Sequence, residues 1–216
     1  MWICPTVTVE NKAEFIRQLN LASKLARRVH FDVSDGTLAH RKLFGLGGMR
    51  WKPNILADIH VMSTYPHAEL KLAELMKPHL VIIHAEADID FVAAARSLRK
   101  SGIKAGLALL QHTEISRIES YLTDYDHVLV FSGNLGYQGG SKADMKLLDK
   151  VRTIRKLNPG IEIGWDGGVN DLNIGPLIEA GVNVANVGSF VQLAKQPSLA
   201  YAKLESAVNS YKRYAP

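Results

Sequence analysis

Short apolar runs alternate with longer amphipathic segments along this chain of 216 residues. The short runs are rich in β-branched and aromatic residues, which predicts strands, and the longer ones repeat apolar residues every three or four positions, which predicts helices. We expect strands over residues 2–7, 28–33, 57–62, 80–84, 104–110, 127–131, 162–165 and 184–187. We expect helices over residues 10–26, 68–76, 89–100, 113–123, 142–157, 173–180 and 198–214. This alternation is typical of a parallel sheet with helical crossovers.

Eight such units in a chain of this length indicate a single α/β domain over residues 1–216, a (β/α)8 TIM barrel. An open doubly wound sheet is the alternative, because periodicity does not distinguish a closed sheet from an open one. Candidate ligands on the second, third and seventh strands favour closure, since their ends converge only in a sheet that curls. The glycine-rich residues 37–54 predict a loop that partly covers the mouth of the barrel.

Three predicted strands end in possible metal ligands. His30 and Asp32 share one face of the second strand, because side chains alternate along a strand; His60 ends the third and Asp166 the seventh. An isolated His-x-Asp is most often an ordinary alternating strand, so it is the recurrence that favours a site. Two imidazoles and two carboxylates suit one divalent cation, Zn²⁺, Fe²⁺, Mn²⁺ or Co²⁺.

Glycine-bearing turns follow the last three predicted strands, at residues 134–140, 167–168 and 188–189. A glycine at such a turn commonly serves only the backbone conformation. Three of them at one end of a barrel favour a phosphate site, because glycine lets backbone N–H groups approach an anion closely.

Composition and charge exclude several classes of partner. The chain is 47% apolar and 22% charged, with a formal net charge of +5. Its basic residues are scattered and carry no interleaved aromatic residues, so we expect no nucleic-acid partner. No apolar run approaches the roughly 18 residues of a membrane span, and no leader pattern opens the sequence, so we expect a cytoplasmic protein without a membrane partner. The single cysteine, Cys4, cannot form an internal disulfide and is interpreted as structural.

With these residues in hand, the chain resembles the ribulose-phosphate 3-epimerase family nearly end to end. The family's His-x-Asp strand, Asp-x-His-x-Met strand and Asp-Gly-Gly turn are matched by His30 and Asp32, by His60 and by Asp166. Further matches are His84-Ala85-Glu86, Lys104-Ala105-Gly106 and the turns at Gly167, Gly168, Gly188 and Ser189.

The resemblance implies a metal-dependent isomerase that inverts C3 of a ketose phosphate, converting D-ribulose 5-phosphate into D-xylulose 5-phosphate through an enediolate. Asp32 and Asp166 would be the two acid/bases, and one divalent metal ion would be held by His30, Asp32, His60 and Asp166. The implied substrate-binding residues are Thr6, His60, Met62, Gly136, Tyr137, Gln138, Gly139, Gly140, Gly167, Gly168, Gly188 and Ser189. The partner would be a small-molecule ketose phosphate, and the family is often oligomeric, so we expect a homo-oligomer.

The substrate walls depart from the family more than the metal core does. The family's Pro-Ser opening is Pro5-Thr6 here, and two of its three pocket methionines are replaced by Ser34 and Phe131. The Asn-Pro after its fifth strand is Leu110-Gln111, and the loop at residues 134–140 has one residue added. These changes keep two alternatives open: a hexulose-phosphate 3-epimerase acting on allulose 6-phosphate, and a metal- and sugar-phosphate-binding barrel without turnover.

Two related barrel families fit less well. The sugar-phosphate decarboxylases need a lysine in an Asp-x-Lys-x-x-Asp strand, which Asp58-Ile59-His60-Val61-Met62-Ser63 lacks. An isomerase of tryptophan synthesis uses a first-strand thiolate as base, but its other strand patterns are missing. Asp35 is interpreted as a turn residue, and His84 is compatible with either a cavity-facing or a hydrogen-bonded core histidine.

Overall fold

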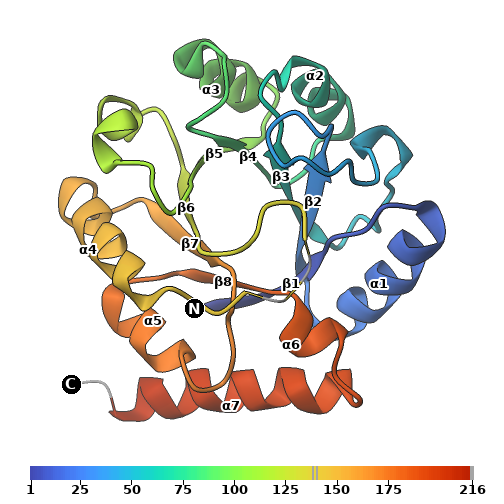
Figure 1. The fold of residues 1–216 in the computed structure, drawn as a ribbon, viewed down its shortest axis with the longest axis vertical. Helices are drawn as coiled ribbons and strands as arrows, with labels where there is room; N and C mark the ends of the chain where they lie inside the picture. Colours follow the sequence, from blue (N-terminus) through green and yellow to red (C-terminus); the bar gives the residue numbers. More distant parts are fainter. Residues whose placement is uncertain (138, 140, 215–216) are drawn as a thin grey trace.

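A computed structural model describes residues 1–137, 139 and 141–214. Within these residues, eight parallel strands form one closed barrel in chain order (Figure 1). They are β1 (Trp2–Val7), β2 (Arg28–Ser34), β3 (Leu56–Met62), β4 (Leu80–His84), β5 (Lys104–Leu109), β6 (His127–Phe131), β7 (Glu162–Asp166) and β8 (Val184–Val187). Strand β8 closes the ring against β1, with Trp2 opposite Val184. The predicted TIM barrel is confirmed, and the open sheet is excluded.

Helices surround the barrel on the outside (Figure 1). They are α1 (Lys12–Leu25), α2 (His67–Met76), α3 (Phe91–Lys100), α4 (Leu148–Leu157), α5 (Ile174–Ala180), α6 (Ser189–Gln192) and α7 (Pro197–Tyr214). Asn11 and Asp90 begin α1 and α3 by accepting a hydrogen bond from a backbone N–H of the first turn. None of the helices in the described part of the chain is long and apolar enough to span a membrane.

The barrel interior holds both polar side chains and an apolar patch. In β2, Val29, Phe31 and Val33 belong to the core between strands and helices, whereas His30 and Asp32 fall on the opposite, inner face. A separate apolar cluster joins β4, β5 and β6 and consists of Leu80, Ile82, Ala108 and Leu129. The apolar patch therefore lies between two buried histidines of the same inner face, His127 at the start of β6 and His84 at the end of β4.

A buried ionic network joins four strands near their N-terminal ends. Arg28 is only 2% exposed and donates to Asp58 at 2.6 Å. Its two terminal nitrogens donate to Glu162 at 2.7 and 2.8 Å, and His127 lies 2.9 Å from the same carboxylate. Because each member has a partner of opposite charge or a hydrogen bond, the network ties β2, β3, β6 and β7 beneath the mouth.

Two helix predictions are wrong, one over the whole segment and the other at its start. Residues 113–123 form two 3-10 turns, Ile115–Arg117 and Glu119–Tyr121, in place of an α-helix. The carbonyls of Leu110, Gln111 and Thr113 accept hydrogen bonds from Lys150 Nζ, so a side chain from a distant helix binds carbonyls before and at the start of this segment. The helix expected over 142–157 begins as a 3-10 turn at Met145–Leu147 and becomes α4 only at Leu148.

Loops from opposite sides meet over the mouth of the barrel. The loop after β6, yellow in Figure 1, crosses the opening toward β2. In it, Leu135 packs on Ala39, Leu43 and Met62, and the Arg41 guanidinium lies 4.7 Å from the Tyr137 ring centroid. The loop after β2 therefore contributes to the cover of the mouth, as the glycine-rich segment predicts, and its only helical turn is the 3-10 turn at Leu46–Gly48.

Candidate functional site

The four predicted ligands meet inside the barrel. In the register of the sheet Asp32 is directly opposite His60, and Asp166 reaches the same point from β7. His30 Nε2 lies 3.3 Å from Asp32 Oδ1 and 3.4 Å from Asp166 Oδ2, and His60 Nδ1 lies 2.9 Å from Asp32 Oδ1. One ligand atom from each of the four residues lies within 4.8 Å of the others.

This geometry fits a metal ion. Ligand atoms bound about 2.1 Å from one ion are roughly 3 to 4 Å apart. The separations from His30 to Asp32 and Asp166 and from His60 to Asp32, 2.9 to 3.4 Å, are close to this range. Neither ring nitrogen of His30 makes a well-directed hydrogen bond within the described residues, although the ring is fully buried. A buried imidazole without a hydrogen-bond partner, beside two carboxylates, is the donor set that a divalent cation requires.

The electrostatics of the cluster also favour a positive charge at its centre. Burial alone would lower the pKa of His30, but the nearby carboxylates of Asp166 and Asp32 raise it to about 10. Burial would raise the pKa of Asp32, but His30 and His60 hold it far below the ordinary value. The Asp32 carboxylate therefore stays ionised in a buried place, where a cation compensates its charge.

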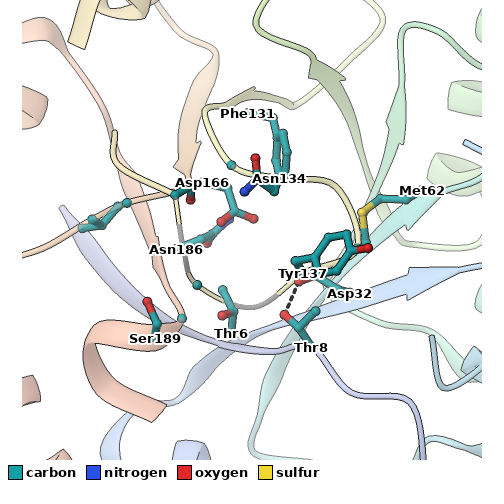
Figure 2. Close-up of a pocket in the computed structure, with 18 residues that line it drawn as sticks. Thr6, Thr8, Asp32, Met62, Phe131, Asn134, Tyr137, Asp166, Asn186 and Ser189 are labelled. Atoms are coloured by element: carbon teal, nitrogen blue, oxygen red, sulfur yellow. Dashed lines mark hydrogen bonds between the residues drawn. The ribbon is translucent and has the colours of Figure 1, made fainter. Parts of the chain in front are cut away.

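Thr8 adds a contact that the sequence analysis did not single out. Its Oγ1 donates a 2.5 Å hydrogen bond to Asp32 Oδ2 (Figure 2). Asp32 Oδ1 faces His60 and His30, so both carboxylate oxygens of Asp32 have partners. The signal in the sequence was weak: Thr8 lies two residues after Thr6, directly beyond the end of β1.

A pocket opens above the cluster and gathers most of the predicted substrate-binding residues (Figure 2). Asp32 and Asp166 line it together with Thr6, Met62, Gly136, Tyr137, Gly139, Gly167, Gly168, Gly188 and Ser189. His60 is fully buried and is not among the lining residues, so it faces the other ligands and not the opening. The predicted Gln138 and Gly140 lie outside the described residues.

The glycine turn after β7 packs against the loop after β6 so closely that no side chain fits. A Cβ on Gly167 would lie 2.3 Å from the backbone nitrogen of Gly133, and one on Gly168 would lie 2.1 Å from that of Ala143. Both glycines have positive φ, +113° and +69°. Glycine is required at both positions by the close approach of the two loops, whatever ligand they bind.

Asn186 and Phe131 also line the pocket and were not predicted as site residues. Asn186 is 2% exposed, and its Oδ1 has no hydrogen-bond partner among the described residues. A polar residue inside the apolar run of β8 was the available signal. The Phe131 ring centroid lies 5.7 Å from that of His60, so an aromatic ring covers one side of the ligand cluster.

The structure also shows the surroundings of Asp35, Cys4 and His84. Asp35 is a turn residue: its carboxylate accepts hydrogen bonds from Thr37 and Ser63. Cys4 is free and fully buried, and burial raises the pKa of its thiol, which agrees with a structural cysteine. His84 is fully buried and lies against His60.

Comparison with known proteins places this geometry in context. The model of the ribulose-phosphate 3 epimerase family matches residues 3–192. The ribulose-phosphate 3-epimerase of Helicobacter pylori is 28% identical over 212 residues, which cover 95% of this chain and 97% of that protein. The enzyme of the same name from Mycobacterium tuberculosis is 32% identical over 201 residues, 89% of this chain and 87% of that protein.

Solved structures with low sequence identity share the fold. KGPDC from Streptococcus mutans in complex with D-R5P superposes with a TM-score of 0.77 at 11% identity and covers 97% of both chains. A 3-hexulose-6-phosphate synthase superposes with a TM-score of 0.73 at 17% identity, over 96% of this chain and 99% of that one. At such identities the likeness shows the barrel alone.

Proposed function

The chain belongs to the ribulose-phosphate 3-epimerase family of isomerases, and from that premise we propose that it inverts C3 of a ketose phosphate, converting D-ribulose 5-phosphate into D-xylulose 5-phosphate. The observation that carries the proposal is the position of two ionisable carboxylates in one pocket. Asp32 comes from β2 and Asp166 from β7, and each lies within 3.4 Å of His30 Nε2. They therefore approach one point from different strands.

Inversion at carbon needs a proton acceptor on one face of the substrate and a donor on the other. Asp32 and Asp166 take these roles, each exchanging its role when the direction of reaction reverses. Asp32 keeps one oxygen bound to Thr8, which fixes its carboxylate plane. Loss of the C3 proton gives an enediolate, and delivery of a proton to the opposite face gives the epimer.

His30, Asp32, His60 and Asp166 would hold the divalent cation, and Zn²⁺, Fe²⁺, Mn²⁺ and Co²⁺ all suit their donor atoms. When bound, such a cation supplies Lewis acidity that stabilises negative charge on the oxygens beside the reacting carbon. His30 and His60 are fully buried, so their part is to bind the cation and exclude water from it.

The glycine turns after β7 and β8 would bind the phosphate. Gly167, Gly168, Gly188 and Ser189 line the same pocket as Asp166. The three glycines carry no side chain that would hinder an anion from approaching their backbone N–H groups. Thr6 offers a hydroxyl for a substrate hydroxyl, Met62 lines the wall, and Gly136, Tyr137 and Gly139 belong to the loop that crosses the mouth. For Gln138 and Gly140, a part in substrate binding is proposed on the resemblance alone.

We also keep three expectations as proposals: one domain over residues 1–216, a place in the cytoplasm, and assembly of the chain with copies of itself. They rest on membership of a family of metabolic enzymes that are often oligomeric. Light scattering of the purified protein measures the oligomeric state directly.

A coupled assay on metal-stripped and metal-loaded protein tests the function. We expect D-ribulose 5-phosphate to be converted only after a divalent metal is restored, with solvent deuterium entering at C3. Faster turnover of allulose 6-phosphate would assign the hexulose-phosphate activity. Tight binding of sugar phosphates without exchange at C3 would contradict an epimerase and favour a binding barrel.

A further inference from the structure

One buried histidine beyond the ligand cluster contacts the ring of His60, and a half-buried glutamate contacts that histidine in turn. His84, at the end of β4, is fully buried, and its Nε2 lies 2.8 Å from His60 Nε2. Its other nitrogen, Nδ1, lies 3.1 Å from Glu86 Oε2. A continuous series of contacts therefore runs from Glu86 through His84 to the imidazole that faces Asp32.

The position of Glu86 is fixed at its far oxygen. Glu86 Oε1 accepts hydrogen bonds from the Thr113 hydroxyl and, at 3.4 Å, from the backbone N–H of Leu110. Burial would raise the pKa of Glu86, but His84 and Thr113 lower it to about 2, so the side chain is a carboxylate that only accepts hydrogen bonds. The proton between Glu86 and His84 must then be on His84 Nδ1.

The proton on His84 Nδ1 determines which histidine donates in the contact between His84 and His60. A neutral imidazole with its proton on Nδ1 has a lone pair on Nε2, so His84 Nε2 accepts, and the proton of the 2.8 Å contact belongs to His60 Nε2. A doubly protonated His84 would place a second buried positive charge beside the cation site. His60 Nδ1, which faces Asp32, is left with its lone pair free for a metal ion.

We propose that Glu86 and His84 are positioning residues that hold His60 in the tautomer with Nε2 protonated, so that Nδ1 is available as the metal ligand. Neither residue belongs to the ligand cluster or lines the pocket above it. The inference rests on the proposed metal site, but it assigns a role to residues outside the ligand set. Outer partners of this kind typically contribute to metal affinity by orienting the ligand.

The isosteric substitution Glu86→Gln should move the protons of His84 and His60 to the opposite ring nitrogens. Leu110 N–H and the Thr113 hydroxyl keep the amide oxygen on their side, so the amide NH₂ faces His84 Nδ1. His84 must then accept at Nδ1 and donate from Nε2, and His60 carries its proton on Nδ1, where the metal should bind. We expect metal affinity to fall about tenfold to a hundredfold.

The test measures Zn²⁺ affinity by competition with a chelating dye for the wild type, Glu86→Gln and the charge-matched control Glu119→Gln, whose residue is exposed in a 3-10 turn. Thermal unfolding confirms that each variant folds. The expected result is wild-type affinity for Glu119→Gln and a large loss for Glu86→Gln. Equal affinities for the two variants would overturn the tautomer proposal alone, whereas a wild type that binds no divalent metal would overturn it together with the metal site.

His84 provides an independent second measurement. In His84→Gln the amide oxygen can replace Nε2 as acceptor for His60, whereas His84→Leu leaves that proton without a partner. We expect the leucine variant to lose affinity as Glu86→Gln does and the glutamine variant to recover most of it. In ¹⁵N-histidine spectra of the zinc-loaded wild type, His60 should show a protonated Nε2 and a proton-free Nδ1; a proton on Nδ1 contradicts the inference.

Discussion

Thr8 Oγ1 donates a hydrogen bond of 2.5 Å to Asp32 Oδ2, which connects the segment after β1 to the carboxylate proposed as an acid/base. A hydrogen bond to a charged group contributes about 1.5 to 3 kcal/mol, and 1.4 kcal/mol corresponds to about a tenfold change in rate. We therefore predict that Thr8→Val lowers kcat about tenfold at saturating metal. Thr8→Ser keeps the donor and should retain most of the activity; a valine variant as fast as the wild type would show that the contact plays no part in turnover.

Asp166→Asn should abolish epimerisation, because an amide cannot accept the C3 proton at neutral pH. Binding of the ketose phosphate should stay measurable by calorimetry, since the glycine turns are unchanged. The variant is measured with excess metal to offset weaker coordination, beside Asp88→Asn, an exposed control. Deuterium exchange at C3 that continues at near wild-type rate in both directions would refute the assigned role.

Gly168→Ala should raise the KM for the sugar phosphate about tenfold or more, because its Cβ would meet the Ala143 backbone nitrogen at 2.1 Å and force the two mouth loops apart. Gly102→Ala is a matched control. Its φ is +77°, close to the +69° of Gly168, but nothing lies within 4 Å of the added Cβ. The control therefore carries the backbone strain without the clash, and an equal rise in KM for both variants would argue against phosphate binding at this turn.

The free energy of unfolding should decrease in acid through Glu162. Burial would raise the pKa of this carboxyl, but hydrogen bonds from Arg28 and His127 hold it well below the ordinary value of 4.5. A lowered folded-state pKa stabilises the fold fully above the unfolded-state value, and this contribution is lost as the pH falls below about 4.5. Urea denaturation between pH 7 and pH 3 measures the loss.

Glu162→Gln should destabilise the chain by about 3 kcal/mol at pH 7, because it leaves the buried Arg28 with only Asp58 as an anionic partner. It should also flatten the dependence of stability on pH in acid. Glu14→Gln, which breaks an exposed pair with Arg17, is the control and should change neither quantity much. A pH profile of Glu162→Gln that parallels the wild type would mean that other carboxyls dominate acid unfolding.

The strands and the ligand cluster were predictable because both follow a period of two. His30 and Asp32 share a face by alternation alone, and His60 is opposite Asp32 in the sheet register. The barrel then brings Asp166 to the same place without any further sequence signal. Strand ends deviate by one residue at most, as in β2, which includes Ser34.

The parts that were not predictable depend on contacts between distant segments. The helix expected over residues 113–123 does not form. The Leu110 carbonyl, just before that segment, accepts a hydrogen bond from Lys150, which is 40 residues away in the sequence. The role of His84 could not be decided from its strand, because its partner Glu86 comes after the strand and is fixed by Thr113 on another loop. Local propensity carries no information on such pairings.

The division of the barrel interior has a consequence for how the protein can change over evolution. Leu80, Ile82, Ala108 and Leu129 form an apolar, low-dielectric patch inside the barrel, and the Phe131 ring lies against that of His60. Apolar side chains weaken the electric field of a carboxylate much less than solvent does. A polar substitution in this patch should therefore weaken the electrostatic interactions of the whole ligand cluster, whereas a substitution at the pocket opening leaves the patch unchanged.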